Sequence, residues 1–152
     1  MSQAPKTIWF QPHTLAELNA TRVGTMIEHL GIEYTASGPD YLEARMPVDA
    51  RTRQPYGLMH GGASLVLAET LGSYGAALTV DPARLRVVGQ EINANHLRAV
   101  TMGHVTGTAR PVHLGNRSQV WSIDIRDDRG RLVCVSRLTI ALLDRRQPAA
   151  PP

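Results

Sequence analysis

The chain has a single cysteine, Cys134, among its 152 residues. An internal disulfide is therefore excluded, and no group of thiolates is available to hold a metal ion. The first eleven residues contain no apolar run, so we expect neither a signal peptide nor a membrane anchor at this end. These absences favour a protein of the reducing cytoplasm that has no membrane-spanning segment.

Aromatic residues and excess charge are also scarce. Aromatic side chains make up 5% of the sequence, Phe10 is the only phenylalanine, and the formal net charge is +3 at pH 7. Proteins that bind nucleic acids usually carry denser basic stripes or aromatic stacking platforms. We therefore expect no nucleic-acid partner.

The length and composition suit one domain. A chain of 152 residues with 43% hydrophobic content can bury a sizeable core but is short for two domains. We assign residues 1–13 to an N-terminal segment and residues 14–143 to the domain. Residues 144–152 are basic, then rich in proline and alanine, and are expected to form a disordered tail.

The domain is expected to open with one helix. Thr14 and Glu17 have the spacing of a capping box, an imperfect apolar stripe continues to Leu30, and Gly31 is a suitable end. Residues 32–47 then turn to an extended pattern, in which apolar and polar side chains alternate as in a half-buried strand.

A second helix is expected at residues 62–78 and should be buried on nearly all sides, because apolar residues occupy most of its circumference. Glu69 lies in its middle and is the only formal charge between Gln54 and Val80. A carboxylate in apolar packing is costly unless it is hydrogen-bonded, paired or protonated. Glu69 is therefore the leading catalytic candidate, with an ordinary surface glutamate as the alternative.

Four further strands are predicted, at residues 87–100, 103–112, 119–126 and 131–143. Residues 127–130 supply the turn chemistry of a hairpin between the last two. Antiparallel strands joined by short turns can curl around one apolar helix and bury it. The predicted fold class is α+β, an antiparallel sheet wrapped around a central buried helix, with an exposed sheet face that invites a partner subunit.

Polar groups near the start of the central helix could act on a carbonyl. Gly61 offers an unpaired helix-terminal N–H group as an oxyanion-hole donor, and Gln54 could donate its side-chain amide. Ser73 lies four residues after Glu69 and can hydrogen-bond to it. His60 could touch a substrate or bind backbone at the turn, and Gly61 could merely fit a tight turn.

The downstream strands hold a basic cluster that suits phosphate groups. His96 and Arg98 are predicted on one face of a strand, and residues 113–117 fall between two strands. A solvated edge with a hairpin loop is the alternative. The six histidines show no metal-ligand spacing, so we expect no metal site.

Three segments, taken together in order and spacing, carry a family resemblance. Residues 53–64 read RQPYGLMHGGAS and are followed by Glu69, residues 88–96 read VGQEINANH, and residues 113–117 read HLGNR. The chain resembles the hotdog-fold acyl-CoA thioesterases over roughly residues 15–143. The nearest group acts on aromatic acyl-CoA substrates such as hydroxybenzoyl-CoA or 1,4-dihydroxy-2-naphthoyl-CoA.

The resemblance implies a mechanism and a substrate. Glu69 would be the nucleophile or general base, Gln54 and the Gly61 N–H would polarise the thioester carbonyl, Ser73 would assist Glu69, and His60 would lie near the thioester. No cofactor is implied, because coenzyme A is part of the substrate. The implied coenzyme A contacts are Gly89, His96, Leu97, Arg98, Ala99, His113, Leu114, Gly115, Asn116, Arg117 and Ser118.

The resemblance also implies a homodimer or homotetramer whose active sites are shared between subunits. One departure is Asn116, where several relatives carry serine, and it affects only the details of nucleotide binding. Two other functions stay open. A 3-hydroxyacyl-thioester dehydratase of this fold would carry a His-Phe-Pro-Gly type motif ahead of the helix, where this chain has His60-Gly61-Gly62. A non-catalytic acyl-CoA sensor would not need a buried Glu69.

Overall fold

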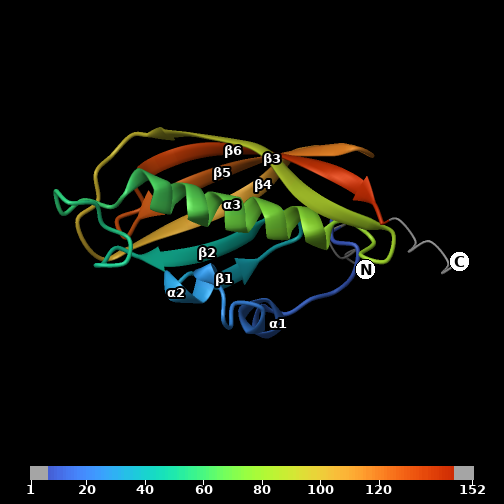
Figure 1. Cartoon of the computed structure of the whole chain (residues 1–152), viewed down its shortest axis with the longest axis horizontal. Coiled ribbons are helices and arrows are strands. Elements are labelled where there is room, and N and C mark those ends of the chain that lie inside the picture. The colour runs from blue at the N-terminus through green and yellow to red at the C-terminus, as the bar shows by residue number, and fades with distance from the viewer. Residues whose placement is uncertain (1–6, 146–152) are drawn as a thin grey trace, which may run out of the picture.

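The computed structural model describes residues 7–145, so most of the predicted tail lies outside the described residues. Six strands form one antiparallel sheet in the order β1-β2-β4-β5-β6-β3. The strands are β1 (Glu33–Ser37), β2 (Leu42–Pro47), β3 (Leu85–His96), β4 (His104–Leu114), β5 (Ser118–Asp127) and β6 (Leu132–Asp144). The sheet curves around the long helix α3 (Gly61–Leu78), as Figure 1 shows, and the expected α+β fold class is confirmed.

The N-terminal helical region differs from the prediction. Instead of one helix ending near Gly31, there are two short helices, α1 (Leu15–Ala20) and α2 (Met26–His29). The capping box of Thr14 and Glu17 is present and starts α1. The break follows from Gly24, whose φ of 72° lies in the left-handed region, where a right-handed helix cannot continue.

Helix α3 packs closely into the concave face of the sheet because glycines lie at two of the contact points. A Cβ on Gly75 would lie 2.8 Å from the Trp121 ring, and a Cβ on Gly107 of β4 would lie 2.7 Å from the Leu71 side chain. Both contacts are closer than a real Cβ could tolerate, so the two glycines set how deeply the helix sits.

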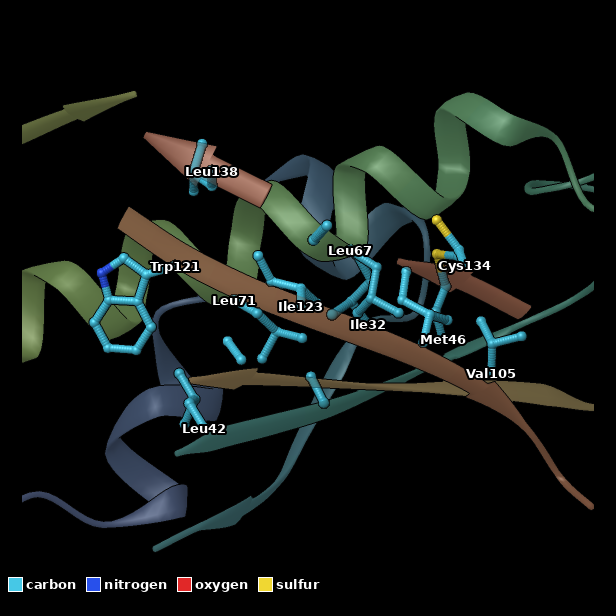
Figure 2. Packing of buried hydrophobic residues seen from close by; sticks show 14 of the residues in the cluster. Ile32, Leu42, Met46, Leu67, Leu71, Val105, Trp121, Ile123, Cys134 and Leu138 are labelled. Atoms are coloured by element: carbon cyan, nitrogen blue, oxygen red, sulfur yellow. The ribbon is translucent and has the colours of Figure 1, made fainter. Parts of the chain in front are cut away.

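The hydrophobic core fills the space between α3 and the sheet. Figure 2 shows Leu67 and Leu71 of the helix lying with Ile123 of β5 and Met46 of β2, all of them fully buried. The predicted alternation along β2 is confirmed, since its apolar side chains are buried and the intervening ones are at least partly exposed. Burial of this kind contributes about 25 cal/mol per Å² of apolar surface, so most of the stability of α3 comes from packing.

An N-terminal strap, residues 7–13, crosses one end of the core. The Trp9 indole stacks on Trp121, with ring centroids 6.4 Å apart and planes within 9°. Its Nε1–H donates to the Gly38 carbonyl at 2.7 Å, and the Phe10 N–H donates to the Leu78 carbonyl at 2.8 Å. The strap therefore joins the β1–β2 turn to the C-terminal end of α3.

The two edge strands of the sheet, β1 and β3, differ in how far their outer backbone groups are already bonded. On the outer side of β1, the Asn19 carboxamide accepts from the Tyr34 N–H and donates to the Tyr34 carbonyl, both at 2.9 Å. This occupies backbone groups that would otherwise pair with another strand. The other edge, β3, runs for twelve residues that are mostly exposed, and within residues 7–145 no segment covers it (Figure 1). The structure thus leaves one long edge open for pairing.

Within residues 7–145, no helix is long and apolar enough to cross a membrane.

The Tyr34 hydroxyl provides a test of the core. The side chain is 2% exposed, and its hydroxyl has no hydrogen-bond partner among the described residues. Burial, with Tyr74 as a second cause, raises the pKa of Tyr34 well above its usual value. Tyr34→Phe should therefore leave the free energy of unfolding at pH 7 unchanged or raise it by about 1 kcal/mol.

The pH dependence follows from the raised pKa. A buried tyrosine with a raised pKa loses stabilisation as pH rises past its unfolded value of about 10, so Tyr34→Phe should lose less stability there than wild type. Urea titrations at pH 7 and above pH 10 would measure both effects, with the exposed Tyr56→Phe as control. A loss of more than about 1 kcal/mol at pH 7 would show that the hydroxyl has a partner.

Candidate active site

The loop that leads into α3 is fixed by hydrogen bonds at its base. Thr52 is 1% exposed, and its hydroxyl donates to the Pro47 carbonyl at 2.7 Å, while its own carbonyl accepts from the His60 N–H at 2.8 Å. Arg53 donates to the Thr101 carbonyl at 2.8 Å. Arg51 bonds Asp49 and lowers the pKa of that carboxyl to about 2. The loop is therefore a rigid platform.

Gln54 begins a tight turn at the tip of this platform. The Gly57 N–H donates to the Gln54 carbonyl at 2.9 Å, and Gly57 has a φ of 81°, which favours glycine. The Gln54 side-chain Oε1 accepts a hydrogen bond from the Tyr56 N–H. Because Oε1 is held by this donor, the amide NH₂ group is the end that remains available to a ligand.

The start of α3 supplies a second donor. His60 is the N-cap residue, and its Nδ1 accepts from the Gly62 N–H at 2.8 Å, which is the backbone contact given above as the alternative to a substrate contact. The hydrogen bonds found among residues 7–145 include none from the Gly61 N–H. Gly61 thus presents a donor at the positive end of an 18-residue helix, where anionic oxygens are stabilised.

Glu69 lies in a niche formed by Ser73 and the backbone of β3. The Ser73 hydroxyl donates to Glu69 Oε1 at 3.3 Å, as its position one turn later predicts. Gly89 of β3 faces the same oxygen, and any Cβ there would collide with it. The carboxylate is half-buried at the seam between α3 and β3. Both neighbours lie against Oε1, and the hydrogen bonds found among residues 7–145 include none to Oε2.

The donors and the carboxylate are too far apart to share one carbonyl within a chain. Gly61 and Glu69 are eight residues apart on α3, which corresponds to about 12 Å along the helix axis. An oxyanion donor must lie about 3 Å from the oxygen, and a nucleophile must reach the attached carbon. The candidate site residues of one chain therefore fall into two separate groups, which we term the donor half-site (Gln54 and Gly61) and the carboxylate half-site (Glu69 and Ser73).

The predicted basic cluster is also divided within one chain, because His96 and the residues around Ser118 lie at different ends of the sheet. His96 pairs with Cys134 of β6, whereas Ser118 pairs with Ala141, about 23 Å further along that strand. The His96 ring lies beside Gly61, since a Cβ on Gly61 would be 2.9 Å from its Nε2. His96 thus belongs with the donor half-site.

Arg98 does not share a strand with His96 as predicted. Strand β3 ends at His96, because the N–H groups of both Leu97 and Arg98 turn to the same Val133 carbonyl and break the regular ladder. Leu97, Arg98 and Ala99 follow in an exposed bend. Their backbone is therefore free to approach a ligand.

The second part of the cluster is a hairpin between β4 and β5. The Gly115 N–H donates to the Ser118 carbonyl at 3.0 Å, and a Cβ on Gly115 would lie 2.9 Å from that oxygen. Asn116 and Arg117 are exposed at the tip, with His113 and Leu114 exposed on the approaching strand. This end of the sheet also carries Gly89, so the hairpin lies toward the carboxylate half-site.

Two groups that hold the site loop in place could not be identified from the sequence. Thr52 looks like any other loop threonine, and the Tyr56 group that binds Gln54 is a backbone N–H, which every non-proline residue has. A Thr three residues after Asp49 is typical of a local side-chain turn, which would have pointed to Thr52. Among residues 7–145, no three His, Cys, Asp or Glu side chains are grouped so as to hold a metal ion.

Comparison with known proteins identifies the class. A family model described as the thioesterase superfamily matches residues 56–134. The proofreading thioesterase EntH of Cronobacter turicensis is 57% identical over 136 residues, covering 90% of this chain and 98% of its own. The chain therefore belongs to the thioesterase superfamily. The 1,4-dihydroxy-2-naphthoyl-CoA hydrolase of Escherichia coli is 53% identical over 90% of this chain and 99% of its own.

Solved structures agree with this assignment and with the hotdog fold. A thioesterase from Pseudomonas aeruginosa, determined as a variant with one glutamine replaced by alanine, is 45% identical with a TM-score of 0.90, covering 91% of this chain and all of its own. A Staphylococcus aureus protein, 35% identical with a TM-score of 0.76, covers 79% of this chain and 99% of its own and was solved with a glutamate replaced by alanine. Another structure of that protein replaces a glutamine 15 positions earlier.

The close contact between Gly89 and Glu69 predicts that a single methyl group added at Gly89 will affect activity. Gly89→Ala should push the Glu69 carboxylate away from Ser73 and lower kcat for acyl-CoA hydrolysis by about 10-fold or more, since a 1 Å displacement can cost about 100-fold. Because Gly89 is exposed on β3, the free energy of unfolding should change by less than about 1 kcal/mol.

A double-mutant cycle checks that the effect acts through Glu69. In a Glu69→Gln background, adding Gly89→Ala should cause little further loss, because the displaced group no longer acts. If the two changes instead multiply, Gly89 affects catalysis by some other route.

Proposed function

We propose that this thioesterase hydrolyses CoA thioesters of aromatic acyl groups, and that each active site combines Glu69 of one subunit with Gln54 and Gly61 of another. The observation that carries the proposal is the separation of about 12 Å between the two half-sites on α3, which one thioester carbonyl cannot span. A site that is incomplete in one chain requires a second copy. The 1,4-dihydroxy-2-naphthoyl-CoA hydrolase relative supports an aromatic acyl-CoA as substrate.

The open edge of the sheet supports the way in which two copies meet. If β3 pairs antiparallel with β3 of a second copy, two six-stranded sheets become one continuous sheet. Glu69 of α3 lies beside the Gly89 end of β3, and Gly61 of α3 lies beside the His96 end. Antiparallel pairing about the middle of the strand therefore brings the carboxylate half-site of each copy toward the donor half-site of the other.

The reaction then follows from the two half-sites. The Gly61 N–H and the Gln54 NH₂ group donate to the thioester oxygen and stabilise the negative charge that develops there. Glu69 Oε2 attacks the carbonyl carbon, or removes a proton from an attacking water. In the first case the C–S bond breaks, the thiolate leaves and takes a proton, and water hydrolyses the resulting anhydride. Ser73 holds Oε1 and fixes the direction of Oε2.

The coenzyme A part of the substrate is proposed to lie over the divided basic cluster. Gly89 and the hairpin residues 113–118 would come from the chain that supplies Glu69, and residues 96–99 from the chain that supplies Gln54. The glutamine and glutamate replaced in the Staphylococcus aureus protein are 15 positions apart, as are Gln54 and Glu69. This matched spacing supports their joint role here.

Glu69→Gln should lower kcat by about 10²- to 10⁴-fold, as expected when a nucleophile or general base is lost. The amide keeps the size of the side chain, so calorimetric binding of a non-hydrolysable acyl-CoA analogue should stay within about 3-fold of wild type. Hydrolysis close to the wild-type rate would remove Glu69 from the mechanism.

Mixing two inactive variants tests the sharing of sites. Glu69→Gln and Gln54→Ala chains that assemble together should form one site with intact Glu69 and Gln54 in each mixed pair. Co-refolded at equal amounts, they should regain about a quarter of wild-type activity, because about half of the pairs are mixed and one of their two sites is intact. Activity no greater than the average of the separate variants would place the whole site within one chain.

A further inference from the structure

Tyr56 is a candidate for direct substrate contact that the catalytic assignment leaves unused. Tyr56 is 89% exposed, more than any other large hydrophobic residue within residues 7–145. Most other aromatic rings have packing partners: Trp9 stacks on Trp121, Tyr34 meets Tyr74, and Tyr41 lies under Arg110, while Phe10 is 53% exposed on the N-terminal strap. A bare ring on a surface indicates a binding role when the backbone beneath it is rigid.

The backbone beneath Tyr56 is rigid. The turn is closed by the Gln54 N–H donating to the Leu58 carbonyl at 2.8 Å and by the Gly57 N–H donating to the Gln54 carbonyl at 2.9 Å. The Tyr56 N–H also binds the Gln54 side-chain oxygen. The Tyr56 side chain and the proposed oxyanion donor therefore extend from the same fixed turn, two residues apart, so the substituents of a carbonyl held by Gln54 lie within reach of the ring.

The two substituents of that carbonyl can be assigned to different sides. The second donor, Gly61, lies against the His96 ring, and the proposed coenzyme A contacts continue from His96 to Ala99. The sulfur side of the thioester therefore faces Gly61 and His96. The acyl side faces the turn that carries Gln54 and Tyr56, which has no formal charge from Gln54 onward.

We propose that Tyr56 packs its ring against the acyl group of the substrate bound at the partner's Glu69 and selects for aromatic acyl groups. The proposal rests on the shared-site thioesterase function described above. Aromatic rings attract one another through offset or edge-to-face contacts beyond what burial alone provides, so an aryl substrate gains more from Tyr56 than an alkyl chain does.

The test compares kcat/KM for benzoyl-CoA and hexanoyl-CoA in wild type, Tyr56→Ala and Tyr56→Phe. Tyr56→Ala should lower the benzoyl-CoA value by about 10-fold and the hexanoyl-CoA value by less than about 3-fold, while Tyr56→Phe retains both. Met26→Ala, which removes another exposed apolar side chain on α2, is the matched control and should change neither.

Three results would overturn the proposal. Equal losses on both substrates would mean that Tyr56 acts only by positioning Gln54, and no loss on either would mean that the ring touches no substrate. Dissociation of Tyr56→Ala in sedimentation experiments would make the ring a subunit contact. Failure of the thioesterase function itself would look different, because wild type would then hydrolyse neither thioester.

Discussion

The depth at which α3 lies in the sheet governs the rest of the structure. Gly75 and Gly107 remove the side chains that would hold the helix away, and the core packs through the space this leaves. Such a helix stays partly exposed at its seam with the edge strand β3, where Glu69 and Ser73 are half-buried. Glu69 lies at that seam, where Gly89 lets its carboxylate approach the strand backbone. Close packing therefore fixes both the stability of the fold and the position of the acid.

The two edges of the sheet differ in whether they can pair with another strand. Asn19 occupies backbone groups of β1, whereas β3 keeps a long, exposed edge. The half-sites lie toward opposite ends of that open edge, one beside Gly89 and the other beside His96. In the proposed assembly, the same backbone pairing would build the interface and complete two sites.

Much of the architecture could be read from the sequence because it depends on local rules. The capping box at Thr14, the alternation along β2 and the hydrogen bond from Ser73 to Glu69 all involve residues within a few positions of one another. Each was predicted from spacing alone and is found in the structure. The expected burial of α3 on nearly all sides is found only in part, because nine of its 18 residues are buried and Ala77 is exposed.

One error was local, and the others arose where distant parts of the chain decide the outcome. An apolar stripe suggested one continuous helix before Gly31, but Gly24 adopts a left-handed conformation and splits it. The basic residues at the end of β3 and just beyond it, together with those of the β4–β5 hairpin, were predicted to form one cluster. Strand register, which spacing does not reveal, places them at opposite ends of β6. The role of Gly89 beside Glu69 likewise depends on how the helix meets the edge strand.

The stacked pair formed by Trp9 and Trp121 has a practical consequence. These are the only two tryptophans in the chain, and both lie where the N-terminal strap meets the core. Intrinsic fluorescence will therefore report the seating of the strap and the packing of the end of α3. The two indoles thus give this protein an intrinsic optical probe of how its N-terminal strap and the end of α3 fold together.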